Sequence, residues 1–245
     1  MRTWIPTFVA LLLAAPALAA DANTIMAEAD AAMNRADDQT ITWQIVNMKP
    51  GAKEPENMLF VSQVKKTKTL TSFDEPANLK GTRVLVLARS QMYIYLPQYQ
   101  KVRRIASHVT KQGFMGTSFS QADMNSSFGD VYDATLVSEA DGQAVLELKA
   151  KPDSDAPYAK AMVTIDTEMD HPLELKYFND KGENVKTEKR TEYECNDEHN
   201  VCLAGVMRME DHTRSAWTEL RRKGWELNSG LSDDVFTTRN LQRGE

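Results

Sequence analysis

The sequence has little of several features that mark common classes of function. Its 245 residues include 35 Asp and Glu against 29 Lys and Arg, which gives a net charge of −6 at pH 7. This balance argues against a nucleic-acid-binding protein, because such proteins usually present a basic surface. We therefore expect no nucleic-acid partner.

Catalytic and metal-binding motifs are equally scarce. The four histidines are His108, His171, His199 and His212. No two of them have the spacing of a zinc ligand pair. The sequence also lacks a G-x-S-x-G elbow, a P-loop and a dinucleotide fingerprint. It therefore predicts a protein that is not an enzyme and that uses no metal or cofactor.

Long apolar runs are confined to the N-terminus. Arg2 precedes the apolar residues 8–15, and Ala17 and Ala19 occupy the two positions that a signal peptidase reads. The run is too short for a transmembrane helix, which needs about 20 apolar residues. We predict a cleavable signal peptide over residues 1–19 and a soluble periplasmic protein. Residue 20 is not a cysteine, so we expect no lipid anchor, and residues 20–245 are expected to form one domain.

Two cysteines are present, Cys195 and Cys202, with a polar, turn-like segment between them. In an oxidising compartment two closely spaced cysteines usually pair. A metal or redox pair is the alternative, but C-x6-C is no recognised redox spacing and one histidine gives too few zinc ligands. We predict a structural disulfide that joins two antiparallel strands near their connecting loop.

The rest of the chain shows two apolar periodicities. Residues 21–35 carry one apolar stripe at helical spacing. After residue 38 the period becomes two, beginning with Ile41, Trp43 and Ile45, and the runs are separated by turns such as Asp141-Gly142. This pattern predicts a mainly β (α+β) fold. We expect about 10–11 antiparallel strands in a strongly curved sheet, an incomplete barrel.

Residues 97–129 break the alternation. Gly113 and Gly116 flank Phe114 and Met115, and Phe119 follows. One interpretation is a helical or looped plug that packs on the sheet. The other is a movable apolar cover over a lipid-sized cavity, because glycine permits hinge geometry and methionine adapts to varied apolar shapes.

Two motifs in this region resemble a known family. Residues 97–105 read P-x-x-x-K-x-R-R-I, and residues 114–123 read F-M-G-T-x-F-S-x-x-D. Both resemble the LolA-like family of outer-membrane lipoprotein-sorting proteins, and more closely the branch often encoded beside RND-type transporters. The resemblance implies an incomplete barrel closed by helices as a lid, and carriage of lipid or lipoprotein through the periplasm. It also implies a lid-closing arginine, for which Arg83, Arg103 and Arg104 are the candidates.

Our first hypothesis is therefore a monomeric carrier that shuttles a lipid or acylated protein. Its partners would be an inner-membrane transporter of RND or ABC type and an outer-membrane receptor. We predict that Phe114, Met115 and Phe119 form the lid, and that Lys101, Arg103 and Arg104 contact headgroups or a partner. The predicted cavity residues are Trp43, Ile45, Phe60, Val84, Val86, Tyr93, Tyr95, Leu146, Met162 and Leu175. For residues 84–87 and 92–96 the sequence leaves open which face points inward, because both faces are apolar there.

The second hypothesis is a module that senses envelope components or serves an RND-type transporter without carrying cargo. The RseB-like regulators use a similar half-barrel in this way. The volume beneath the lid separates the two hypotheses, because a sensor with a filled core needs no cavity.

Overall fold

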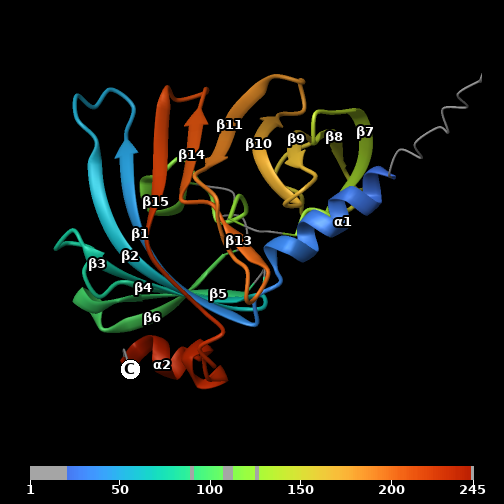
Figure 1. The fold of residues 1–245 in the computed structure, drawn as a ribbon. Helices are drawn as coiled ribbons and strands as arrows, with labels where there is room; N and C mark the ends of the chain where they lie inside the picture. The colour runs from blue at the N-terminus through green and yellow to red at the C-terminus, as the bar shows by residue number, and fades with distance from the viewer. Residues whose placement is uncertain (1–20, 89–90, 107–112, 125–126, 244–245) are drawn as a thin grey trace, which may run out of the picture.

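The computed structural model describes residues 21–88, 91–106, 113–124 and 127–243 (Figure 1). The predicted signal peptide (residues 1–19) and His108 lie outside these residues. No helix in the described ranges is long and apolar enough to cross a membrane.

The helical elements are α1 (Ala22–Met33), η1 (Pro97–Tyr99), η3 (Phe114–Gly116), η4 (Asp233–Phe236) and α2 (Thr238–Arg243). The first strands are β1 (Asp38–Met48), β2 (Glu56–Lys65), β3 (Lys68–Glu75), β4 (Arg83–Ala88), β5 (Gln91–Leu96), β6 (Lys101–Ile105), β7 (Tyr132–Ala140) and β8 (Gln143–Ala150). The remaining strands are β9 (Lys160–Asp166), β10 (His171–Phe178), β11 (Asn184–Thr191), β12 (Glu194–Asn196), β13 (Val201–Leu203), β14 (Val206–Asp211) and β15 (Ala216–Leu227).

One antiparallel sheet of 13 strands forms the body of the molecule, in the order β6-β5-β4-β3-β2-β1-β15-β14-β11-β10-β9-β8-β7. It consists of two meanders joined by the pairing of β1 with β15, and Figure 1 shows that it is strongly curved. The predicted mainly β fold with a curved antiparallel sheet is confirmed.

The sheet has more strands than the 10–11 expected. β6 lies in the region that the sequence predicts to be irregular, because its sequence KVRRI does not alternate. Outside this sheet the chain forms one further hairpin, and Glu192, directly after β11, takes a left-handed backbone conformation with φ 56°. The chain then leaves the sheet as the separate β12–β13 hairpin and returns at Gly205, whose N–H donates to the carbonyl of Thr191 at 3.1 Å.

The disulfide joins Cys195 and Cys202, which lie directly opposite each other in the β12–β13 hairpin. The predicted staple between two short antiparallel strands is therefore confirmed. The hairpin loop also meets the end of α1, where Arg35 Nη1 donates to the carbonyl of Asn200 at 2.7 Å. The disulfide thus fixes the hairpin loop, which in turn holds the chain directly after α1.

The strand order explains the irregular region. β6 and β7 are consecutive in sequence but form the two opposite edges of the sheet. The chain must therefore cross from one edge to the other between these strands. The described residues of this connection, 113–124 and 127–131, lie on the concave face, where Phe119, Phe128 and Val131 are buried. Helix α1, predicted over residues 21–35, covers part of the same face with its buried Ile25 and Ala29.

The outer face of the β3–β6 region has a cover of its own. Phe236 of η4 and Leu241 of α2 pack against Leu70 and Leu85, and we call these four buried residues the C-terminal cluster. Both faces of β4 and β5 are consequently covered. This double burial explains why both faces of these strands are apolar in the sequence.

Candidate functional site

The concave face of the sheet carries a large cluster of buried apolar residues, which we call the central cluster. It includes five of the predicted cavity residues: Trp43, Ile45, Phe60, Leu146 and Leu175. All five are buried. They come from β1, β2, β8 and β10, so the two meanders contribute to one surface.

The other predicted cavity residues divide between the faces. Val84 and Val86 lie opposite Thr71 and Thr69 in β3, on the side of the sheet that carries Phe73 of the central cluster. Tyr93 and Tyr95 instead pack against the C-terminal cluster. Val84 and Val86 pair with Ile94 and Met92 of β5, so Tyr93 and Tyr95 point to the opposite face. The sequence left the inward face of these two strands open, and the four residues do not share it.

Met162 is also placed on the outer face. Its neighbours Ala161 and Val163 are buried in the central cluster, whereas Met162 is only partly buried and lies opposite Lys176 of β10. Both Met162 and Val163 are apolar, so the sequence of β9 did not identify the inward side.

The cover loop, residues 113–124, is compact. The N–H of Phe114 donates to the carbonyl of Phe119 at 2.7 Å, and the Thr117 hydroxyl donates to the carbonyl of Phe114 at 2.7 Å. A Cβ atom on Gly113 would collide with the carbonyl oxygen of Thr117. Gly113 is therefore required for close approach within the loop.

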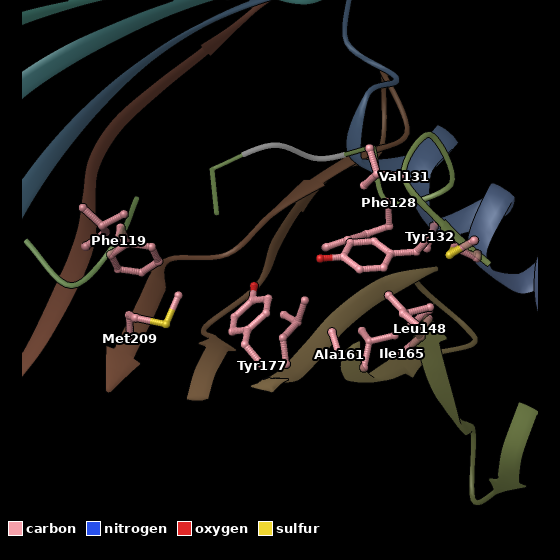
Figure 2. Packing of buried hydrophobic residues seen from close by; sticks show 14 of the residues in the cluster. Phe119, Phe128, Val131, Tyr132, Leu148, Ala161, Ile165, Tyr177 and Met209 are labelled. Carbon is pink, nitrogen blue, oxygen red and sulfur yellow. The ribbon is translucent and has the colours of Figure 1, made fainter. Parts of the chain in front are cut away.

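The cover loop presents its aromatic side chains to the sheet. Phe119 is 2% exposed and belongs to the central cluster, and Phe114 and Met115 pack against that cluster. The ring centroids of Phe114 and Phe73 are 5.9 Å apart. Figure 2 shows Phe119 near Met209, and Phe128, Val131 and Tyr132 above Leu148 and Ile165. The structure shows this region as a loop that packs on the sheet.

A first polar tether joins the cover loop to the centre of the sheet. The N–H of Ser118 donates to Thr218 Oγ1 at 2.7 Å, and the Thr218 hydroxyl donates to Asn47 Oδ1 at 2.6 Å. Asn47 Nδ2 returns to the loop by donating to the carbonyl of Gly116 at 3.3 Å. Because Asn47 and Thr218 are buried, this tether satisfies polar groups that water does not reach.

A second tether is ionic. Lys186 Nζ of β11 lies 2.9 Å from Asp123 Oδ2, and the Tyr158 hydroxyl donates to Asp123 Oδ1 at 2.8 Å. Within the loop, the N–H of Ser120 donates to Asp123 Oδ2, and the N–H of Asp123 donates to Ser120 Oγ. This reciprocal pair is the arrangement of a capping box. It gives a structural reason for the S-x-x-D at the end of the second motif.

The concave face of β11 and β10 holds further buried polar groups next to this tether. Glu188 accepts from the Tyr177 hydroxyl at 2.8 Å and from Arg190 Nε at 2.7 Å. Burial and the neighbouring carboxylates raise the pKa of Tyr158 and of Tyr177 well above the usual value. Both phenols are therefore neutral hydrogen-bond donors at physiological pH.

The arginine candidates for closing the lid lie elsewhere. Arg83 Nη2 donates to the carbonyl of Gln242 at 3.1 Å, on the side of the C-terminal cluster, and Arg103 and Arg104 are exposed on edge strand β6. Arg214 contacts the cover loop instead, because its Nη2 donates to the carbonyl of Thr117 at 3.4 Å. Arg214 lies in a polar turn and gave no sequence signal.

The space under the cover is small. A cavity of about 20 Å³ lies beside Asp123 and Phe128 and is lined by Ala122, Asp123, Ser127, Phe128, Val131, Tyr132, Pro157 and Tyr177. That volume holds about one water molecule. In the described part of the chain, no three His, Cys, Asp or Glu side chains are grouped to hold a metal ion. The arrangement offers an apolar surface and a tethered cover rather than a reactive centre.

Comparisons with known proteins agree with this architecture. A family model described as an uncharacterized protein family matches residues 65–243. The chain belongs to the family that this model describes. A domain designated as an outer-membrane lipoprotein-sorting protein from Vibrio parahaemolyticus superimposes with a TM-score of 0.80 and 26% identity, covering 91% of this chain and 98% of that one. No curated protein sequence matches the chain.

Two further solved structures share the fold. A DUF1329 family protein from Desulfovibrio piger has a TM-score of 0.81 at 23% identity, covering 90% of this chain and 97% of that one. A LolA superfamily protein from Nitrosomonas europaea has a TM-score of 0.73 at 19% identity, covering 90% and 99%. The LolA-like sheet is therefore preserved over nearly the full length of each chain.

Proposed function

We propose that this LolA-like protein is a periplasmic carrier that binds the acyl chains of a lipid or lipoprotein between the concave face and the cover loop. It would shuttle this cargo between an inner-membrane transporter, of RND or ABC type, and the outer membrane. One observation carries the proposal. The apolar concave face is covered by a crossing segment that is tethered by side chains and not paired into the sheet.

The energetics suit acyl-chain binding without chemical reaction. Burying an acyl chain contributes about 0.8 kcal/mol for each CH₂ group. The surface left by a displaced cover would be lined by Trp43, Ile45, Phe60, Leu146 and Leu175. The cavity of about 20 Å³ is far too small for an acyl chain, so binding requires the cover loop to move and both tethers to break.

Two further points support the cellular role. The predicted signal peptide directs the chain to the periplasm. The Vibrio parahaemolyticus relative is designated a lipoprotein-sorting protein, and we extend that role to this chain as part of the proposal.

A cover-locked variant tests the proposal. Thr218 Oγ1 lies 2.7 Å from the backbone nitrogen of Ser118, so Ser118→Cys with Thr218→Cys places two cysteines on neighbouring residues, which a short thiol-reactive cross-linker can join. We expect the wild type to bind a fluorescent fatty acid and the cross-linked double variant to lose that binding. Ser118→Cys alone and Thr218→Cys alone are the controls and should still bind. Equal binding by the locked and single variants would contradict the proposal.

The second candidate, a non-carrier sensor or accessory module of an RND-type transporter, is favoured by the nearly filled interior. Native mass spectrometry of protein purified from its own periplasm separates the two. A bound lipid mass supports the carrier. A ligand-free protein that also fails to bind fatty acid supports the module.

A further inference from the structure

Charge is segregated along the chain in a way that the carrier function does not require. Residues 76–122 contain no Asp or Glu but seven Lys and Arg, although the chain as a whole has a net charge of −6. The next segment is the reverse. Residues 123–148 contain six Asp and Glu and no Lys or Arg.

The sheet order places these two segments at opposite edges. The basic segment supplies β4, β5 and β6, which form one edge, and the acidic segment supplies β7 and β8, which form the other. Figure 1 shows β6 and β7 at the two far ends of the curved sheet. The molecule therefore has a positive edge and a negative edge.

The basic residues of the positive edge gather at one end of it. Lys101 and Arg103 are exposed on β6, directly after the turn that follows β5. The loop that carries Lys80 reaches the same turn, because a Cβ atom on Gly81 would lie 3.6 Å from Pro97 Cγ. We call Lys80, Tyr99, Lys101 and Arg103 the docking edge.

Tyr99 adds an exposed aromatic group to these cations. Its side chain is 57% exposed, and the Arg103 guanidinium carbon lies 5.6 Å from the centre of its ring. A tyrosine combines an apolar ring with a polar hydroxyl, which suits it to the boundary between lipid headgroups and water. The docking edge thus combines positive charge with an interfacial aromatic.

We propose that the docking edge binds the anionic headgroup surface of a phospholipid bilayer. A bilayer is a plane of one charge sign, and it matches the cations of the docking edge, which outnumber the two exposed carboxylates, Asp74 and Glu75, at the start of the loop that carries Lys80. A protein partner normally meets charges of both signs. The acidic edge at the other end of the sheet is repelled by the same bilayer, so the charge separation also orients the molecule.

Cationic edge strands have a second general role, which is to prevent strand-to-strand aggregation. That role predicts that loss of the charges increases self-association. It predicts no binding to vesicles, so the two roles give different results in one experiment.

The test is co-sedimentation of the full-length mature protein with phosphatidylglycerol vesicles and with phosphatidylcholine vesicles at low salt. The inference extends the proposed carrier function, but the test uses no free acyl ligand. Including the cover-locked protein separates the two, because the docking edge should bind vesicles while the cover is closed.

We expect binding to the anionic vesicles only, and its loss in 0.5 M salt, where the screening length falls to about 4 Å. Lys80→Glu/Lys101→Glu/Arg103→Glu should weaken binding by more than about tenfold. Lys53→Glu/Lys181→Glu/Lys223→Glu is the matched control, with three exposed lysines elsewhere and the same charge change. It should retain most of the binding.

Two outcomes overturn the inference. One is a wild type that binds neither vesicle, which points to an acidic protein surface as the occupant. The other is equal loss of binding in both triple variants, which means that net charge and not the docking edge determines binding.

Discussion

Two segments outside the strands cover the sheet, and they are attached differently. The cover loop crosses the concave face and is tethered through Asp123, Asn47 and Thr218. The C-terminal segment, residues 228–243, covers the outer face of the β3–β6 region directly after β15. Each buries an aromatic side chain, Phe119 or Phe236.

The C-terminal segment is fixed where it starts. The Asp38 carboxylate accepts hydrogen bonds from the N–H groups of Ser229 at 2.9 Å, Gly230 at 2.9 Å and Leu231 at 3.0 Å. Here one buried carboxylate satisfies three successive backbone groups that have no strand partner. The segment is thus bound into the fold by its own backbone.

The cover loop is held to the sheet by side chains. The backbone–backbone hydrogen bonds of its described residues lie within the loop, whereas the N–H of Asn228 donates to the carbonyl of Asp38 in β1 at 2.9 Å, where the C-terminal segment begins. Lys186 and Thr218 lie 63 and 100 residues away from their cover-loop partners. Such contacts can be exchanged for water when the loop lifts, whereas its internal hydrogen bonds move with it. The difference suggests one permanent cover and one that opens as a unit, and the following predictions test it in order of expected effect.

Asp123→Ala should have the largest effect. Removing one partner of a buried ion pair costs about 3–5 kcal/mol, because the remaining Lys186 charge loses its counter-ion. We expect this loss to appear in local opening, as faster hydrogen exchange of the Ser118 and Ser120 amides. The free energy of global unfolding, measured with urea, should fall by less than the free energy of this local opening. Asp133→Ala removes an exposed carboxylate of β7 and is the control. Unchanged exchange in Asp123→Ala would contradict an ionic tether.

Leu241→Ala should lower the free energy of unfolding by about 2–4 kcal/mol, because Leu241 is fully buried in the C-terminal cluster. Urea unfolding measures this loss. In contrast to Asp123→Ala, the free energy of opening measured by hydrogen exchange at Ser118 should fall by no more than the free energy of unfolding. Arg239→Ala, at an exposed position of the same helix, is the control. A selective effect on the cover loop would show that the two covers are coupled.

Asp38→Asn should lower the free energy of unfolding by about 1–3 kcal/mol at pH 7, because a charged acceptor of several hydrogen bonds becomes neutral. Burial raises the pKa of Asp38, but hydrogen bonds from Leu231, Ser229 and Gly230 outweigh burial and hold the pKa below its usual value. Because the pKa of Asp38 is lower in the folded than in the unfolded protein, its ionised carboxylate stabilises the fold. This stabilisation is present above the unfolded pKa, near 4, and is lost as the pH falls through the folded pKa.

The difference in urea stability between wild type and Asp38→Asn should therefore shrink between pH 5 and pH 2, on the scale of these pKa values. Asp37→Asn alters the exposed neighbouring carboxylate and should show little difference at either pH. A difference that is independent of pH would mean that the Asp38 charge does not contribute.

Tyr158→Phe should have the smallest effect. It removes the hydroxyl that donates to Asp123 but keeps the ring, whose centroid lies 4.5 Å from that of Tyr177. The free energy of opening the cover loop should fall by about 1 kcal/mol, measured by hydrogen exchange of the Ser118 and Ser120 amides. Tyr99→Phe, on the exposed turn before β6, is the control. A loss as large as that of Asp123→Ala would show that Tyr158, and not Lys186, is the main tether.

Much of the fold could be predicted from the sequence. The alternation around Ile41, Trp43 and Ile45 identified β1 and its buried side, because only one face of β1 is apolar. The same reasoning failed for Tyr93, Tyr95 and Met162. In β5 both faces are covered, and in β9 adjacent residues are both apolar, so alternation carried no information about the inward side.

Most of the tether residues could not be predicted from local sequence patterns either. Asp123 stood in a recognisable motif, and its capping partner Ser120 is three residues away. Lys186, Tyr158, Asn47 and Thr218 are ordinary strand and loop residues, and their contacts with the cover loop depend on the curvature of the sheet. No local pattern encodes a hydrogen bond between residues 118 and 218.

The sequence by itself determined the antiparallel sheet, the opening helix, the disulfide hairpin and the segregation of charge between residues 76–122 and 123–148. These features depend on local spacing, composition or short loops. Only the tertiary structure decided that β6 and β7 are opposite edges, that the described part of the connection between them covers the concave face, and that a cavity of about 20 Å³ lies beside Asp123 and Phe128. The reason is that β1 pairs with β15, a contact between the two ends of the sheet-forming chain that no short-range pattern specifies.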